Sequence, residues 1–289
     1  MERQKRLWAI AFLLPAVVSY TVIGFLPNLG SIALSLFHWN GIAPHLDFAG
    51  GRNFIDLVSD PVFYTALVNN LVFTVASMGF AMIFGFALAY FLYRGIAGGG
   101  FLRTIYYFPV VVSMVAAGMM WRWIYDPNFG LLNAVLKAVG LGALAGNWLG
   151  FGRALISVIV VSVWKTTGVA MILFIAGLQS MSKEILESAQ IDGAGELQTV
   201  RHVTVPMLTP IISIVVIILL IRSFSAFDLV YVMTGGGPGH ASEVLSTYSY
   251  TQAFGALRVG YSSAIAVASF VLQFALAAVY LWRFRNENI

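Results

Sequence analysis

Residues 182–206 read SKEILESAQIDGAGELQTVRHVTVP, a polar stretch between two long apolar ones that cover 154–178 and 207–233. It holds four of the chain's twelve acidic residues. A plain connector between helices usually has about 2–8 residues, whereas this one has 25. The length favours an element that projects from the apolar body and docks on a partner over a simple solvated link.

The local pattern of this stretch predicts a helix–turn–helix. Ser182 suits the N-cap of a first helix, and the acids that follow suit the positive end of its dipole. Gly193 can adopt the left-handed conformation that ends a helix. A second short helix is predicted over 195–204, and Pro206 would then lie in the first turn of the next apolar segment, where its missing N–H costs nothing.

The composition of the whole chain indicates a membrane protein. Hydrophobic residues make up 60% of its 289 residues and charged residues 10%, against about a quarter charged in soluble domains. The net charge is +4, but the basic residues are distributed between apolar segments and form no continuous basic stripe. We therefore expect membrane lipid, and not nucleic acid, as a partner. The chain has no cysteine, which excludes disulfides and thiolate chemistry.

Six apolar segments are long enough to cross the hydrocarbon core as helices, for which about 20 residues are needed. The sequence therefore predicts an all-α polytopic membrane protein with six transmembrane helices and a single domain over 1–289. The predicted spans are 7–36, which has prolines at 15 and 27, 66–93, 104–124, 154–178, 207–233 and 261–282. The first run is longer than the apolar core of a cleavable signal peptide, which favours an uncleaved span.

The basic residues of the loops predict the orientation. If the N-terminus lies inside, nine Lys and Arg side chains fall on the inner face and three on the outer face, which favours both termini in the cytoplasm. The inner set is Arg3, Lys5, Arg6, Arg94, Arg103, Lys183, Arg201, Arg283 and Arg285; the outer set is Arg52, Lys137 and Arg258. The loop 182–206 is then cytoplasmic. Two outer stretches, 128–144 and 242–254, have the spacing of short surface helices.

The motif inside the polar loop resembles a known family. Glu187-Ser-Ala-Gln-Ile-Asp-Gly-Ala194, followed by Val203-Thr-Val-Pro206 and Pro210, is similar to the EAA motif of binding-protein-dependent ABC importer permeases. Ser188 stands where the family commonly has alanine. The Asp-Gly-Ala form and Thr234-Gly-Gly-Gly-Pro238 resemble the carbohydrate branch related to the maltose transporter membrane subunits. The likeness covers essentially the whole chain, including Trp39-Asn40-Gly41 and Asp60-Pro61.

This resemblance implies a function for the loop. In the family it is the coupling helix, seated in a cleft of an ATPase subunit. The residues carried over as ATPase-coupling are Glu187, Ser188, Ala189, Asp192, Gly193 and Ala194. The implied partners are a second homologous permease, an ATPase dimer that binds the ATP, and an extracytoplasmic solute-binding protein. The implied location is the bacterial cytoplasmic (inner) membrane.

The sequence offers no chemistry of its own. It has no Gly-x-x-x-x-Gly-Lys-Ser/Thr loop, no His-Glu-x-x-His motif and no nucleophile elbow. Its four histidines are scattered rather than at metal-ligand spacing. We therefore expect no catalytic residue, no bound metal and no cofactor, so the chain would not be an enzyme.

The solute pathway is expected beside the coupling loop, by analogy with maltose-type permeases. Hydroxyl and aromatic side chains suit sugars, and the candidates are Ser162, Lys165, Thr166, Ser223 and Phe227. Ionisable side chains within spans are costly and should pair or face the interior. Arg222 and Asp228, six residues apart, would not share one face of a continuous helix, so each needs a partner elsewhere.

The leading interpretation is the permease subunit of an ATP-driven importer of a sugar or sugar-like solute, working by alternating access. Permeases for an amino acid, a peptide or glycerol phosphate remain as alternatives. An ion-coupled secondary transporter would need acids in the midplane, and the only candidate in a span is Asp228. An intramembrane enzyme would need a catalytic cluster, which the sequence lacks.

Overall fold

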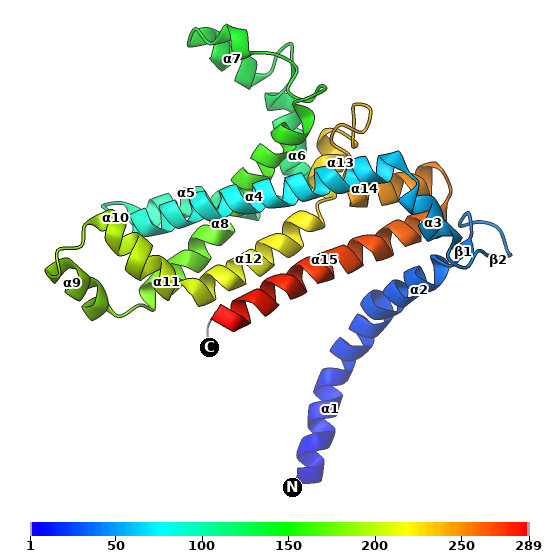
Figure 1. Cartoon of the computed structure of the whole chain (residues 1–289), viewed down its shortest axis with the longest axis horizontal. Helices are drawn as coiled ribbons and strands as arrows, with labels where there is room; N and C mark the ends of the chain where they lie inside the picture. Colours follow the sequence, from blue (N-terminus) through cyan, green and yellow to red (C-terminus); the bar gives the residue numbers. More distant parts are fainter. Residues whose placement is uncertain (1, 288–289) are drawn as a thin grey trace. The chain divides into compact units, whose positions relative to one another are not determined.

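The computed structural model describes residues 2–287; within them, the side chains of residues 2, 3, 6, 7, 9, 10, 183, 186, 187, 190 and 284–287 are not described. The chain divides into two units. Unit 1 comprises Met1–Phe63 and Tyr248–Leu272, and unit 2 comprises Tyr64–Thr247 and Gln273–Ile289. Nearly every described element is a helix, which confirms the all-α prediction (Figure 1).

Unit 1 begins with a nearly continuous helix made of α1 (Glu2–Ser19), a π-helical turn (Tyr20–Phe25) and α2 (Leu26–Leu34). Pro15 does not end it. A two-stranded antiparallel ribbon of β1 (Phe37–His38) and β2 (Asp47–Phe48) follows, and then α3 (Arg52–Val58). Unit 1 also contains the first part of α15 (Val259–Glu287). The apolar side chains of Ala11–Leu34 are not buried, as expected where lipid is the solvent.

Asp60 connects three parts of unit 1. Its Oδ1 accepts the backbone N–H of Val62 at 2.8 Å, and its Oδ2 accepts the hydroxyls of Tyr248 and Tyr261. Burial alone raises the pKa of a carboxyl, but these hydrogen bonds to the charged form outweigh it and hold the pKa of Asp60 below its ordinary value. The carboxylate therefore stabilises unit 1 as long as it is charged.

We expect Asp60→Asn to lower the free energy of unfolding by about 1–3 kcal/mol, the contribution of hydrogen bonds to a charged group. Because the folded pKa is depressed, the wild-type stabilisation is complete above the unfolded value near 3.8 and disappears as the pH falls through the folded value. Thermal unfolding of the purified protein at neutral and acidic pH measures both effects. Asp56→Asn, which removes an exposed pair with Arg52, should change little.

Unit 2 contains nearly all of α4 (Pro61–Tyr93) and the helices α5 (Gly99–Val111), α6 (Met114–Ile124), α8 (Ala154–Gln179) and α12 (Thr209–Phe224), together with the short α13 (Asp228–Met233). Of the long candidate spans, α8 is the most buried, and it packs against α5 and α12. Glycines permit the closest approaches: a Cβ at Gly168 would lie 2.6 Å from the carbonyl oxygen of Tyr106, and one at Gly85 would lie 2.5 Å from the Cβ of Ala170.

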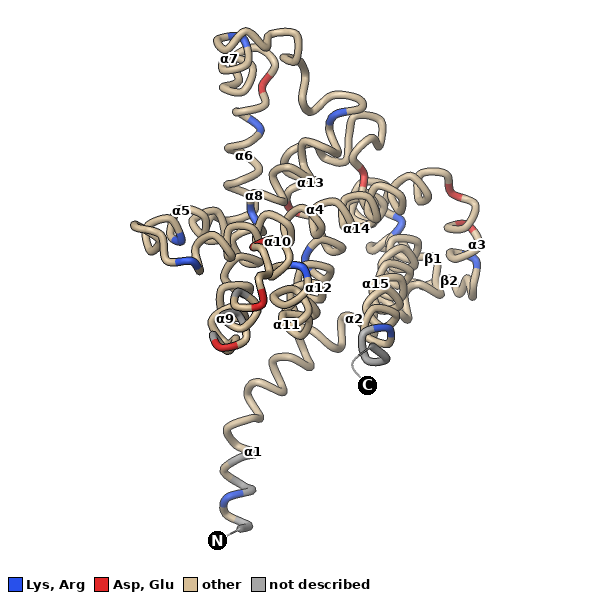
Figure 2. Tube along the Cα trace, turned by 60° about the vertical axis from the view of Figure 1, so that its left-hand side comes forward, with Lys and Arg blue, Asp and Glu red and all other residues tan. Residues whose placement is uncertain are grey.

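Shorter helices connect the long ones along the chain. The amphipathic helix expected within 128–144 is α7 (Leu131–Ala138), and the one expected within 242–254 is α14 (Leu245–Tyr250), which continues as a π-helical turn (Thr251–Gly255). The polar loop forms α9 (Lys183–Ile191), α10 (Glu196–Thr199), a π-helical turn (Val200–Thr204) and α11 (Val205–Met207). Charged residues are found mainly near helix ends and in connections (Figure 2).

The described residues include four helices that can each cross a membrane alone, and six spans if each of two bent helix pairs counts as one. The polytopic prediction is confirmed, but two predicted spans are not straight helices. The span predicted over 104–124 is α5 and α6, bent by 99°. The span predicted over 207–233 is also broken, with a 72° bend before α12 and a second break between α12 and α13.

Prolines and a serine account for two of these breaks. Pro210 lies in the first turn of α12, where its ring prevents a helix from continuing straight through residue 206. Pro206 therefore belongs to α11, not to the first turn of the fifth span as predicted. Ser113 caps α6 through a hydrogen bond from the N–H of Ala116 at 3.1 Å, and this favours a new helix start there.

Candidate functional site

The break between α5 and α6 leaves backbone carbonyls without helical partners, and Lys165 binds them. Lys165 lies on α8 and is only 5% exposed. Its Nζ donates to the carbonyl oxygens of Pro109 at 2.6 Å and Val110 at 3.0 Å, and to that of Val112. All three N–H bonds of the ammonium are thereby used, at the negative end of the α5 dipole. The side chain acts here as a helix cap.

The break between α12 and α13 is satisfied in the same way by neutral side chains. The buried Asn70 of α4 donates to the carbonyl of Phe224 at 3.3 Å and accepts from the N–H of Leu245 at 3.3 Å. Ser246 donates to the carbonyl of Ala226 at 2.6 Å. The prediction of one helix through Arg222 and Asp228 is wrong, because residues 225–227 between them are not helical.

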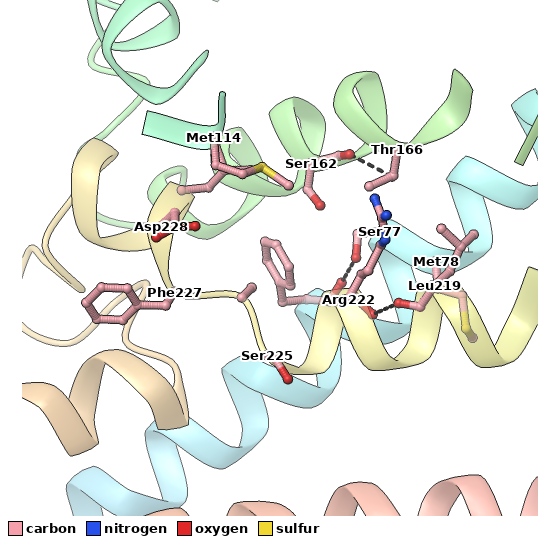
Figure 3. A pocket seen from close by; sticks show the side chains of 14 residues that line it. Ser77, Met78, Met114, Ser162, Thr166, Leu219, Arg222, Ser225, Phe227 and Asp228 are labelled. Carbon is pink, nitrogen blue, oxygen red and sulfur yellow. Dashed lines mark hydrogen bonds between the residues drawn. The ribbon is translucent and has the colours of Figure 1, made fainter. Parts of the chain in front are cut away.

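These two breaks border a cavity of about 220 Å³ in unit 2. It lies between α4, α6, α8, α12, α13 and the non-helical link, and Figure 3 shows the side chains that surround it. Four of the five predicted pathway residues line it, namely Ser162, Thr166, Ser223 and Phe227. The fifth, Lys165, is not among the lining residues. Sequence reasoning missed Ser77, Met78 and Met114, which lack any motif.

The hydroxyls of the cavity wall are oriented by their own helices. Thr166 donates to the carbonyl of Ser162 at 2.7 Å, and Ser223 donates to that of Leu219 at 2.7 Å (Figure 3). Ser77 donates to the carbonyl of Phe73 at 2.5 Å. Since the hydroxyl protons of Thr166, Ser223 and Ser77 are used within their helices, these three oxygens have lone pairs left for the cavity. Such a wall accepts hydrogen bonds from a hydroxylated solute.

Two charged side chains of opposite sign also line the cavity, Arg222 and Asp228. Within the described part of the chain neither belongs to an ion pair, and Figure 3 shows them in different parts of the lining. Phe227 is an aromatic component of the wall and stacks on Tyr231, with ring centroids 5.1 Å apart. The cavity thus combines acceptors, an aromatic group and charges that sum to zero.

The polar loop has the geometry that its sequence predicts. Gly193 adopts a φ of +81°, and the N–H of Ala194 donates to the carbonyl of Ala189 at 3.0 Å, the hydrogen bond of a left-handed helix end. The predicted helix–turn–helix is confirmed, although its second helical segment continues to Met207. Ser182 donates its hydroxyl to Glu184. Figure 1 shows the loop at the end of unit 2 where α8 ends and α12 begins.

The surface of this loop is unusually apolar for a polar sequence. Ile191 is 86% exposed and Leu197 80% exposed, on either side of the turn. Ser188 and Asp192 are exposed, and Ala189 and Ala194 are half-buried. The side chain of Glu187 lies outside the described residues. The loop therefore presents large apolar side chains beside small and acidic ones.

A buried carboxylate organises the glycine-rich turn after α13. Glu243 accepts from Thr247 and from His240 Nδ1 at 3.0 Å, and a Cβ at Gly236 would lie 2.6 Å from this carboxylate. Ser242 closes the turn with a hydrogen bond to the carbonyl of Gly237 at 2.7 Å. The turn encloses an acid, which does not suit a phosphate. Within the described residues, no His, Cys, Asp and Glu side chains gather as a metal site.

Comparison with known proteins identifies the family of the chain that contains this cavity and this loop. The family described as "Binding-protein-dependent transport system inner membrane component" matches residues 61–284, which include the cavity and the loop. The chain belongs to this family. The resemblance based on the EAA-like motif is thereby confirmed, as is the location in an inner membrane. The family is one of transport permeases.

Relatives match along their whole length. The probable ABC transporter permease protein YurN of Bacillus subtilis is 38% identical over 289 residues, with 99% of each chain covered. The trehalose/maltose transport system permease protein MalF of Thermococcus litoralis is 31% identical and covers 95% of this chain and 93% of its own. A bacterial alginate ABC transporter, solved with an alginate pentasaccharide-bound periplasmic protein, shares the fold: TM-score 0.81, 23% identity, 96% and 94% coverage.

We expect Lys165→Met to lower the free energy of unfolding by about 2–3 kcal/mol, because it leaves buried carbonyls without a donor. Thermal denaturation in detergent and abundance in the membrane both report the loss. Lys137→Met, which removes an exposed cation of α7, serves as the control. A wild-type denaturation midpoint for Lys165→Met would contradict the capping role.

Proposed function

We propose that this chain is the membrane-spanning subunit of an ATP-driven importer for a neutral, hydroxyl-rich solute such as a sugar. The observation that carries the proposal is the exposed helix–turn–helix between α8 and α12, in a chain that belongs to a transport permease family. Since the sequence has no phosphate-binding loop, the energy would come from ATPase subunits. The chain itself would carry out no chemistry.

The cavity supports the choice of solute. Hydroxyl oxygens that accept, and the aromatic Phe227, match the hydroxyls and apolar faces of a sugar. Arg222 and Asp228 leave the lining without net charge, and Lys165 is engaged by carbonyls rather than facing the cavity. An acidic solute would find one cation opposed by one anion. The relatives named for trehalose/maltose and multiple-sugar transport support a sugar over an amino acid or a peptide, and the anion glycerol phosphate fits a lining without net charge less well.

The loop is placed so that movement of a bound partner would be transmitted to the helices that line the cavity. A partner that binds α9 and α10 would contact the exposed side chains of Ile191 and Leu197. The small residues Ala189 and Ala194 would allow it to approach closely. Glu187 and Asp192 would supply acidic groups at the edge of the contact. Movement of α9 would pass directly to α8 and, through α10 and α11, to α12. Residues of both α8 and α12 line the cavity. The same motion could therefore expose the cavity first to one side and then to the other, as alternating access requires.

The proposed partners follow from this route. Two ATPases would seat two such loops, so a second, homologous permease is expected beside this chain. The family depends on a binding protein, and the alginate transporter was solved with its periplasmic protein, which supports delivery of solute from outside. The loop 182–206 and both termini would lie in the cytoplasm. The family's dependence on a binding protein and the relatives named as ABC transporter permeases support an ATP-driven mechanism over an ion-coupled one.

We expect Gly193→Pro and Glu187→Lys to assemble normally yet reduce solute uptake at least about tenfold relative to ATP hydrolysis. Proline cannot adopt the positive φ at position 193, and lysine reverses a charge at the proposed docking rim. The ratio of uptake to ATP hydrolysis in proteoliposomes containing the complete importer is the measurement. Normal ratios in both variants would remove the loop from the coupling route.

Filling the cavity should stop transport without disturbing assembly. We expect Thr166→Leu with Ser223→Leu to abolish uptake while membrane abundance stays within about twofold of wild type, since both changes exchange oriented acceptors for apolar bulk. Thr167→Leu on the same helix is a matched control, because Thr167 does not line the cavity. Unchanged uptake in the double variant would place the pathway elsewhere.

A further inference from the structure

An apolar groove runs along the outer side of the first turns of α8, away from the solute cavity. It has a volume of about 400 Å³. One wall is α8 itself, where Ile156 is 62% exposed and Val160 47% exposed, one turn apart on one face. The other wall comes from α7 and the connection that follows it, through Leu132 and Leu144. Trp148 and Tyr125 complete the lining.

A single cation lies among the groove's lining residues. Arg153 immediately precedes α8, and its guanidinium lies over the ring of Trp148, 5.0 Å from the centroid. One guanidinium nitrogen donates to the carbonyl of Leu144 at 3.2 Å. The side chain is otherwise exposed, and within the described residues it belongs to no ion pair. Its remaining N–H groups are free to bind an anion.

This arrangement matches an amphiphile. Arg153 immediately precedes α8, a helix long and apolar enough to span a membrane, and tryptophans at the ends of such helices favour the headgroup level. From there Ile156 and Val160 lead along the helix axis into the hydrocarbon region, a path of about 10 Å at 1.5 Å per residue. A phosphate at the guanidinium would form charge-assisted hydrogen bonds, and one acyl chain would follow the apolar strip.

We propose that this groove binds an anionic phospholipid, with its phosphate on Arg153 and an acyl chain against Ile156 and Val160. A site for a protein partner would be expected to have a rim of polar side chains around its apolar centre. Here the lining consists of apolar and aromatic side chains with Arg153 and the buried Ser157, whose hydroxyl already donates to the carbonyl of Trp148 at 2.7 Å. One charge at one end of an apolar strip fits a lipid.

Native mass spectrometry of the complete purified importer tests this, with phosphatidylglycerol and phosphatidylcholine supplied in turn. We expect retained phosphatidylglycerol to exceed phosphatidylcholine, and Arg153→Gln to reduce it about fivefold, the effect of one basic residue on binding to anionic lipid. Arg153→Lys should retain it within about twofold. Lys137→Gln, which removes a cation of α7 outside the groove, should leave it unchanged.

Two further variants keep the proposal open to refutation if Arg153→Gln fails to assemble. Val160→Trp leaves the cation in place but fills the strip, and it should also lose the lipid. Because the chain has no cysteine, Ile156→Cys gives it a single thiol for a photoactivatable benzophenone, which should attach to lipid. Equal retention of both lipids, full retention in Arg153→Gln and Val160→Trp, or attachment of the benzophenone to the second permease would overturn the proposal.

Discussion

Backbone carbonyls that lose their helical partners inside a membrane must find other donors, and this requirement shapes unit 2. Hydrocarbon offers no hydrogen bonds, so each unsatisfied group costs several kcal/mol. The gap between α5 and α6 is tolerated because the Lys165 ammonium binds three carbonyls. The gap between α12 and α13 is tolerated because Asn70 and Ser246 donate to two. Without these donors the spans would have to be continuous.

The cavity exists because those helices are interrupted. Where α12 stops, residues 225–227 turn away and leave space beside Ser162 and Thr166 of α8. The same helices lead to the polar loop, so the elements that line the cavity are directly connected to the loop that we propose as the docking site. Broken helices that surround a binding cavity are a recurring solution in transporters, since irregular backbone is stable at that depth only where protein or water satisfies it.

Apolar length and turn chemistry made much of this structure predictable. Hydropathy located every apolar segment, and Gly193 marked the loop's turn correctly. Four of the five residues predicted for the pathway line one cavity; they were chosen for their residue types and their place next to the loop, and their role in transport stays a prediction. The breaks between α5 and α6 and on either side of α12 were not predicted, because hydropathy measures the polarity of side chains and carries no information on whether the backbone stays helical. Lys165 was included among the pathway candidates by analogy with the family. Its capping contacts could not be predicted, because the three carbonyl partners lie more than fifty residues away in sequence.

The exposure of Ile191 and Leu197 has a consequence for how the cell must handle this chain. Exposed large aliphatic side chains that lie close together mark either an interaction site or a liability to aggregate. A copy synthesised in excess of its partners would display that surface until it was covered or degraded. An unassembled copy would therefore tend to aggregate through Ile191 and Leu197, and a bound partner would remove that tendency by covering them.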